Sequence, residues 1–100
     1  MELREVGAMR EAVRKVPGGK MLRVTLDSSG STIRRVIITG DFFFYPEDLL
    51  PELETLLQGH EINASLLTST IEEFLRRNNA TLIGASAADL ASVIMSACSP

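Results

Sequence analysis

Residues 12–40, which read AVRKVPGGKMLRVTLDSSGSTIRRVIITG, contain two successive strand–turn–strand patterns. In residues 21–27 the apolar side chains of Leu22, Val24 and Leu26 occupy every second position. This period of two is typical of a strand that buries one face and leaves the other open. The stretch therefore predicts antiparallel strands that are adjacent in sequence.

A turn and a return strand follow. Residues 28–31 read SSGS, in which glycine tolerates positive φ and the serines bond to nearby backbone. Residues 32–39 are rich in β-branched side chains and end at Gly40, so they are predicted to return beside the first strand. Upstream, residues 12–16 are a candidate third strand. It is closed by the Pro-Gly-Gly turn at residues 17–19, because proline fixes one φ and glycine permits a tight bend.

Further along the chain the apolar period lengthens to about 3.6 residues, which predicts three helices. The first begins with Asp48 as its N-cap. The second covers residues 63–78 with Asn63 as its cap, and the third begins at Ser86, which forms a capping box with Asp89. In the first helix one apolar stripe contains Leu49, Leu50, Leu53, Leu56 and Leu57. The second helix is expected to bury Leu67, Ile71, Phe74 and Leu75, and the third Leu90, Val93 and Ile94.

Strands followed by helices indicate an α+β fold, with a small antiparallel sheet of about three strands and about three helices packed on one face. No repeat or linker divides the chain, so residues 1–100 are predicted to form a single domain, with residues 1–11 as an N-terminal arm whose structure the pattern leaves open. On the other sheet face, Met21 and Thr25, with part of the set Ile33 and Ile37, are expected to stay partly exposed. Such a face is a natural docking surface.

The composition, 45% hydrophobic and 23% charged, is that of an ordinary soluble globular protein. No apolar run approaches the length of about 18 residues that a membrane span needs, and the N-terminal residues lack a secretion signal, which predicts a cytoplasmic protein. Residues 1–40 hold eight Lys/Arg against four Asp/Glu, whereas residues 41–100 hold two against nine. The acidic second part and the net charge of −3 argue against a nucleic-acid partner.

Metal binding and self-contained catalysis are not expected. The sequence has one cysteine, Cys98, and one histidine, His60, which are too few for a disulfide or a four-ligand zinc site. His60 lies in a Gly-His-Glu turn rather than in a pattern typical of a catalytic triad. We therefore predict no catalytic residue and no metal ligand.

Residues 18–20, Gly-Gly-Lys, resemble a phosphate-binding loop because paired glycines expose backbone N–H groups beside a cation. They depart from a Walker loop, since Arg14 stands in place of its first glycine and Met21 in place of the residue that holds magnesium. A simple tight turn and half of a shared site both stay open. In a shared site, Lys15 and Lys20 would reach an anion bound by another chain.

Residues 40–46, GDFFFYP, contain every aromatic residue except Phe74. Since neighbouring side chains alternate faces in an extended chain, four successive rings cannot all point inward. We expect two rings in the core and one or two at the surface, where aromatic side chains are typical interface anchors. Asp41 is interpreted either as a turn cap or as part of this signature.

The order Lys-Val-Pro-Gly-Gly-Lys at residues 15–20, then a hairpin, then Ile-Thr-Gly-Asp-Phe-Phe at residues 38–43, then a leucine helix ending in Leu-Gln-Gly at residues 57–59 resembles the C-terminal accessory domain of lipoate-protein ligases. The resemblance covers about residues 12–95. In bacterial ligases of this kind the domain is fused to the catalytic one. A separate chain is similar to the small subunit of the split ligases of some archaea.

The resemblance implies an accessory subunit that is not active alone and forms a heterodimer with a large catalytic subunit. The pair would activate lipoate with ATP to lipoyl-AMP and then transfer lipoate to a lysine of lipoyl-domain proteins. ATP, magnesium and lipoate would be bound by the catalytic subunit and none by this chain alone. Candidate contacts to the adenylation site of the partner are Lys15, Gly18, Gly19 and Lys20, and the candidate interface or structural signature is Gly40, Asp41, Phe42 and Phe43.

The resemblance also implies the SufE/NifU-like fold of sulfur-acceptor and iron–sulfur scaffold proteins, which supplies a rival function. Those proteins use cysteines, of which this chain has Cys98 alone. An interaction module that serves some other enzyme is the remaining alternative. It predicts no effect on lipoate activation.

Overall fold

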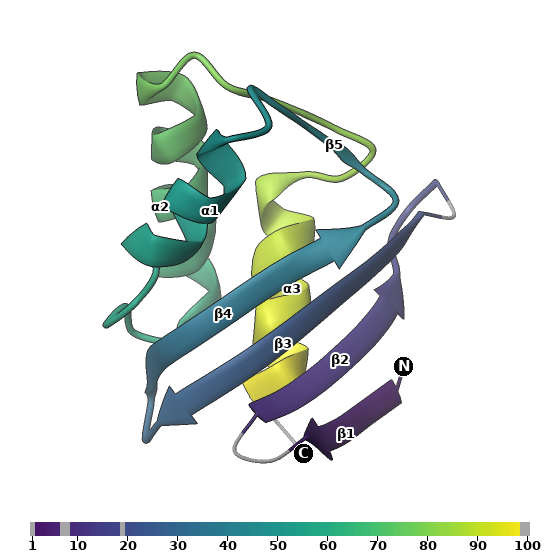
Figure 1. Ribbon diagram of the computed structural model, residues 1–100, viewed down its shortest axis with the longest axis vertical. Helices are drawn as coiled ribbons and strands as arrows, with labels where there is room; N and C mark the ends of the chain where they lie inside the picture. Colours follow the sequence, from purple (N-terminus) through teal and green to yellow (C-terminus); the bar gives the residue numbers. More distant parts are fainter. Residues whose placement is uncertain (1, 7–8, 19, 99–100) are drawn as a thin grey trace.

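The computed structural model describes residues 2–6, 9–18 and 20–98, with the backbone alone for residues 2–6 (Figure 1). Four strands form one antiparallel sheet in the order β1-β2-β3-β4: β1 (Glu2–Val6), β2 (Met9–Lys15), β3 (Met21–Ser29) and β4 (Thr32–Gly40). Two short strands, β5 (Phe43–Tyr45) and β6 (Thr81–Ile83), pair as a separate antiparallel ribbon. The helices are α1 (Leu49–Leu56), α2 (Ala64–Arg77) and α3 (Ala87–Cys98).

The predicted α+β class is confirmed, but the sheet is larger than predicted. The sheet has four strands, whereas about three were predicted. The additional strand is β1, which pairs with β2 and lies in the N-terminal arm whose structure the sequence did not predict. The β5–β6 ribbon was not predicted. Within the residues that the structure describes, no helix is long and apolar enough to cross a membrane.

A β-bulge in β4 decides which of the two isoleucines, Ile33 or Ile37, stays exposed on the open face. Ile33 is 1% exposed and belongs to the core, not to the open face. Asp27 pairs with Arg35 but Ser28 pairs with Ile33, so Arg34 is an extra residue without a cross-strand partner position. A bulge of this kind reverses which face the following side chains occupy. Ile33, before the bulge, therefore faces the helices, whereas Ile37, after it, lies on the open face as the prediction allowed.

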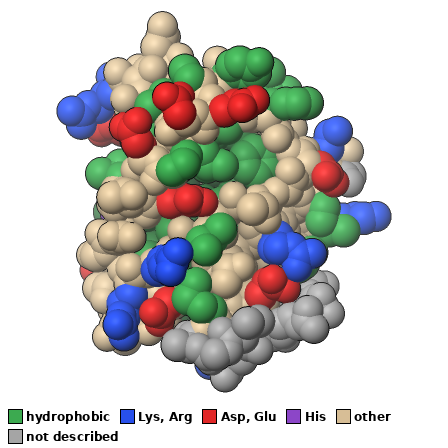
Figure 2. Space-filling model, viewed as in Figure 1, with side chains coloured by type: hydrophobic (Ala, Val, Ile, Leu, Met, Phe, Trp, Pro, Cys, Tyr) green, Lys and Arg blue, Asp and Glu red, His purple; other side chains and the backbone are tan. Residues whose placement is uncertain are grey.

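The open face of the sheet has the mixed character expected of it. Met21 and Ile37 are 36% and 37% exposed, and Thr25 is half-buried. Between them run charged side chains, including the ion pair Arg23–Glu11 with an N–O distance of 2.9 Å. Figure 2, viewed from this face, shows hydrophobic side chains scattered among Lys/Arg and Asp/Glu.

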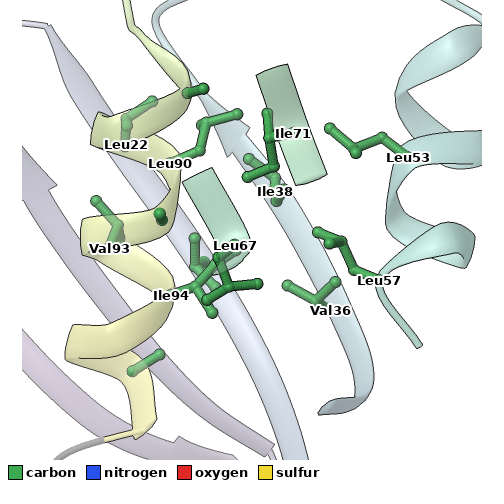
Figure 3. Close-up of a cluster of buried hydrophobic side chains, with 14 of the residues drawn as sticks. Leu22, Val36, Ile38, Leu53, Leu57, Leu67, Ile71, Leu90, Val93 and Ile94 are labelled. Carbon is green, nitrogen blue, oxygen red and sulfur yellow. The ribbon is translucent and has the colours of Figure 1, made fainter. Parts of the chain in front are cut away.

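The core lies between the other sheet face and the helices, as predicted. α3 packs across β2 and β3, α2 packs on α3, and α1 lies beside β4 (Figure 1). Figure 3 shows apolar side chains of all three helices meeting those of β3 and β4. The largest fully buried side chains are Leu22, Val24, Leu26, Ile33, Ile38, Leu53, Leu57, Leu67, Ile71, Leu90, Val93 and Ile94.

All three helices begin directly after the predicted N-cap, and two of the three caps form side-chain hydrogen bonds. The Asn63 side chain accepts a hydrogen bond from the Leu66 N–H at 3.1 Å. Ser86 and Asp89 form the reciprocal capping box, with distances of 3.1 and 2.9 Å. α1 begins directly after Asp48 as predicted, but the Asp48 side chain makes no capping hydrogen bond.

The outer edge of β4 is covered by α1 and the segment that follows it. The Glu54 carboxylate accepts a hydrogen bond from the Ile38 N–H at 2.7 Å. The Ile33 N–H donates to the His60 carbonyl at 2.9 Å, and the Gly59 N–H donates to the Ile33 carbonyl at 2.6 Å. These bonds occupy backbone groups that an edge strand would otherwise offer to another strand.

Candidate interface at the turn end of the sheet

The turn between β2 and β3 carries the two lysines singled out in the sequence. The Val16 N–H donates a hydrogen bond to the Lys20 carbonyl at 2.8 Å, which closes the turn after Lys15. Gly18 has a φ of +97°, a conformation that favours glycine. Gly19, the remaining predicted residue of the turn, lies outside the described residues. The positive φ of Gly18 thus explains why the motif has a glycine at this position of the turn.

The second motif lies against this turn although it is about twenty residues away in the chain. The Asp41 N–H donates to the Met21 carbonyl at 2.8 Å. Gly40 has a φ of +152°, and a Cβ at this position would overlap the Met21 carbonyl oxygen. A Cβ on Gly84, just after β6, would lie 3.2 Å from the Asp41 carbonyl oxygen. Gly40 and Gly84 therefore permit three segments to meet closely at this end of the sheet.

Lys15 and Lys20 are both exposed, and neither forms an ion pair with any described residue. Nearby cations are engaged differently. Arg14 points to the helix side, where it donates to the Ser92 hydroxyl, and Arg23 pairs with Glu11. The two ammonium groups at the turn are thus available to an anion from outside the described part of the chain.

The aromatic residues of β5 alternate as predicted. Phe44 is 5% exposed, and its ring centroid lies 6.5 Å from that of Phe74. Phe42, just before the strand, is half-buried and packs against the core. Phe43 and Tyr45, by contrast, are 65% and 59% exposed. Of the predicted signature residues, Phe42 has a packing role and Phe43 faces outward.

Sequence reasoning missed the residue that completes this outward face. Phe43 pairs directly with Ile83 of β6, which is 55% exposed. We call Phe43, Tyr45 and Ile83 the β5–β6 apolar face. Ile83 had one available signal, the Thr-Leu-Ile stretch at residues 81–83, in which two of three residues are β-branched. Its pairing partner is about forty residues distant.

The apolar face and the lysine turn lie at the same end of the molecule. Figure 1 places β5 and the β2–β3 turn at that end, beyond the last residues of β4. In the same view, Figure 2 shows hydrophobic side chains gathered where β5 lies, with acidic side chains nearby. Asp41 connects the two features, because its N–H bonds to Met21 and its carbonyl oxygen lies where only a glycine at position 84 leaves ample room.

A groove of about 860 Å³ lies between α1 and α2. Its lining mixes Leu56 and Phe74 with Glu52, Glu73 and Arg77, and no candidate residue of the turn end contributes to it. The groove therefore does not bring the predicted site residues together.

His60 has a structural setting. Its Nδ1 lies 2.7 Å from the Glu61 carbonyl oxygen and its Nε2 lies 2.8 Å from the Thr70 hydroxyl, so both ring nitrogens have partners within this chain. In the described ranges, no group of three or more His, Cys, Asp or Glu side chains is arranged to hold a metal ion.

Comparison with known proteins identifies the fold. No protein-family model matches the sequence. Lipoate-protein ligase A subunit 2 from Thermoplasma acidophilum is 48% identical over 42 residues, which are 42% of this chain. That alignment spans 45% of the relative's length.

A solved structure extends the likeness over nearly the whole chain. It describes an archaeal lipoylation system from Thermoplasma acidophilum, a bi-partite lipoate protein ligase and its E2 lipoyl domain. One of its chains matches with a TM-score of 0.72 and 30% identity, over 86% of this chain and 93% of the other.

The matched fold, together with the two glycine motifs that meet at one end of the sheet, defines a small α+β component of a two-part ligase. The chain belongs to the family of lipoate-protein ligase A subunit 2.

Proposed function

We propose that this chain is the accessory subunit of a two-part lipoate-protein ligase and forms a heterodimer with the catalytic subunit. The pair activates lipoate with ATP to lipoyl-AMP and then transfers lipoate to a lysine of lipoyl-domain proteins. ATP, magnesium and lipoate bind to the catalytic subunit. The observation that carries this proposal is the likeness to a chain of a bi-partite ligase, which covers 86% of this chain and 93% of the other.

The activation step develops negative charge that this chain is suited to stabilise. A lipoate carboxylate oxygen attacks the α-phosphorus of ATP, a P–O bond to the β-phosphate breaks, and pyrophosphate departs with the bonding electrons. Positive groups placed near that departing charge lower the barrier, most effectively where water is excluded. Lys15 and Lys20, exposed and without ion pairs to the described residues, have the chemistry for this role.

The glycines of the turn end support this role indirectly. Gly18 allows the lysine turn to bend sharply, and Gly40 allows β4 to end against Met21. Both therefore fix where Lys15 and Lys20 emerge from the sheet. Gly19 stays a predicted contact to the adenylation site, and Asp41 contributes the N–H that holds the β4 end in place.

The proposal includes a fold relationship to the SufE/NifU-like proteins. An antiparallel sheet with its helices on one side supports this relationship. A superposition on such proteins with a TM-score below about 0.5 would contradict it. A cytoplasmic location and a single domain over residues 1–100 stay predictions from the sequence.

Reconstitution tests the function directly. The chain, the candidate catalytic subunit, ATP, magnesium and lipoate are mixed, and lipoate-dependent exchange between ATP and labelled pyrophosphate is measured. We expect exchange with both proteins present and little with either alone. If the catalytic subunit alone catalyses exchange as fast as the two proteins together, the proposal is wrong. An interaction module that serves some other enzyme would then be the remaining function.

A further inference from the structure

The β5–β6 apolar face is the most exposed cluster of large hydrophobic side chains among the described residues. Phe43, Tyr45 and Ile83 are 65%, 59% and 55% exposed, and Phe43 lies directly opposite Ile83. Since a buried aromatic side chain removes about 150–250 Å² from water, each of the two rings still offers roughly 100 Å² or more. The face is large enough for the centre of an interface that covers about 800 Å² of each partner.

Packing within the chain does not require these side chains. The alternate residues of the ribbon already face inward, where Phe44 is 5% exposed against Phe74 and Leu82 packs on the core. A strand sequence that serves only to cover a core carries polar residues on its outer face. Here the outer face is aromatic and aliphatic, which favours a second role for it.

The position of this face indicates what covers it. It is joined to the lysine turn through the contacts of Asp41 with Met21 and Gly84. If Lys15 and Lys20 act at the adenylation site of the catalytic subunit, the surface beside them must also lie against that subunit. The open sheet face is the weaker candidate, because Met21 and Ile37 are less exposed and are separated by charged side chains.

We infer that Phe43, Tyr45 and Ile83 are the apolar anchor by which this chain docks on the catalytic subunit, with the lysine turn at the rim of the same interface. This inference rests on the proposed function and adds the surface that performs the docking. The partner is expected to offer an apolar depression for the two rings. Anionic groups, from its own side chains or from its bound nucleotide, are expected to face the lysines.

Binding measurements on the two full-length subunits test the inference. Tyr45→Ser and Ile83→Thr change the outward side chains, and Ile83→Thr keeps a β-branched residue in the strand. We expect the Kd for the catalytic subunit to rise about 30-fold for Tyr45→Ser, which corresponds to about 2 kcal/mol. The matched control is Leu66→Ala on α2, where the side chain is also exposed, at 49%, and no change in Kd is expected.

Folding and activity measurements distinguish weakened docking from a failure to fold. The thermal midpoint of each isolated variant is measured. A third variant, Phe43→Leu, removes the ring but keeps an apolar side chain in the ribbon. When a variant of the apolar face is added at saturating concentration, pyrophosphate exchange is expected to reach the wild-type rate. The reason is that the substitution weakens docking and leaves the chemistry unchanged.

If the wild-type pair is active but Phe43→Leu, Tyr45→Ser and Ile83→Thr all bind as the wild type does, the docking inference is wrong and the proposed function stands. Weakened binding by Ile37→Ser instead of by these variants would transfer the interface to the open sheet face and also overturn the inference. If the wild-type chain binds but does not stimulate exchange, the proposed function is wrong. The Kd values of the variants then still show whether the apolar face is the docking surface.

Discussion

At the scale of single residues, the two lysines of the β2–β3 turn differ from Arg14 of β2 and Arg23 of β3. Arg14 and Arg23 have partners within the chain, whereas Lys15 and Lys20 make no ion pair with the described residues. A charge that is not used for internal stability can be removed at little cost to folding. This makes the electrostatic hypothesis testable by substitution.

Lys20→Ala is expected to lower lipoate-dependent pyrophosphate exchange by the complex about tenfold or more, because the departing pyrophosphate loses a nearby positive charge. Lys20→Arg should retain much of the activity, since the charge is kept. Arg35→Ala, which removes an exposed cation from the open sheet face, serves as the control and should leave exchange unchanged. An unchanged rate for Lys20→Ala, measured at saturating accessory subunit, would exclude the electrostatic role.

A substitution at Gly40 is expected to have a large effect on the free energy of unfolding. At φ +152°, and with the Met21 carbonyl oxygen where a Cβ would lie, alanine has no unstrained conformation there. We expect Gly40→Ala to reduce the free energy of unfolding by about 3 kcal/mol or more. Gly30→Ala is the matched control, because Gly30 has a φ of +61° but open space around it, and should cost only about 1 kcal/mol. Equal losses in urea denaturation would contradict the close approach at Gly40.

At the scale of secondary-structure elements, the covering of β4 explains why the sheet ends there. Helix α1 supplies the Glu54 carboxylate to the Ile38 N–H, and the next segment bonds to Ile33. Exposed strand edges invite pairing with other chains. The arrangement thus directs association away from β4 and leaves other surfaces for a partner.

Glu54→Ala leaves the Ile38 N–H without its partner and is expected to reduce the free energy of unfolding by about 1–3 kcal/mol. Glu54→Gln retains a carbonyl oxygen at the same position and should lose less than half as much. Urea denaturation followed by circular dichroism measures both. If the two variants are equally destabilised, the carboxylate acts through its charge and not through this hydrogen bond.

Local patterns predicted the elements that depend on neighbouring residues. The alternation of Leu22, Val24 and Leu26 gave the buried face of β3, and the side chains of Asn63 and Ser86 gave two helix starts, because these signals act within four residues. The pattern left open which of Ile33 and Ile37 stays exposed, since no local rule distinguishes a regular strand from a strand with a bulge between these residues.

Pairing between distant segments could not be predicted in the same way. β6 has three residues and finds its partner β5 only after the chain has passed through two helices. The motifs at the turn end were recognisable from their residues, but their meeting through Asp41 and Met21 follows from the register of β3 and β4. The sequence therefore identified the candidate residues of both motifs, but only the fold shows that they lie at the same end of the sheet.

At the scale of the whole molecule, the chain has a complete core but an incomplete functional surface. Most large apolar side chains of the described residues are buried or half-buried, and the exceptions include the β5–β6 apolar face at the end that also carries the lysine turn. Within the described residues there is no cluster of metal-binding side chains. A surface that combines an apolar centre with cations at its rim is suited to a partner that binds phosphates.

We propose that this chain acts in the activation of lipoate and much less in its transfer to the acceptor. Acceptor lipoylation by the catalytic subunit is therefore measured with and without this chain, first from lipoate plus ATP and then from preformed lipoyl-AMP. We predict that the chain raises the first rate about a hundredfold or more, equivalent to about 2.7 kcal/mol in the barrier, and changes the second less than about threefold. Equal stimulation of both reactions, or of neither, would contradict the account.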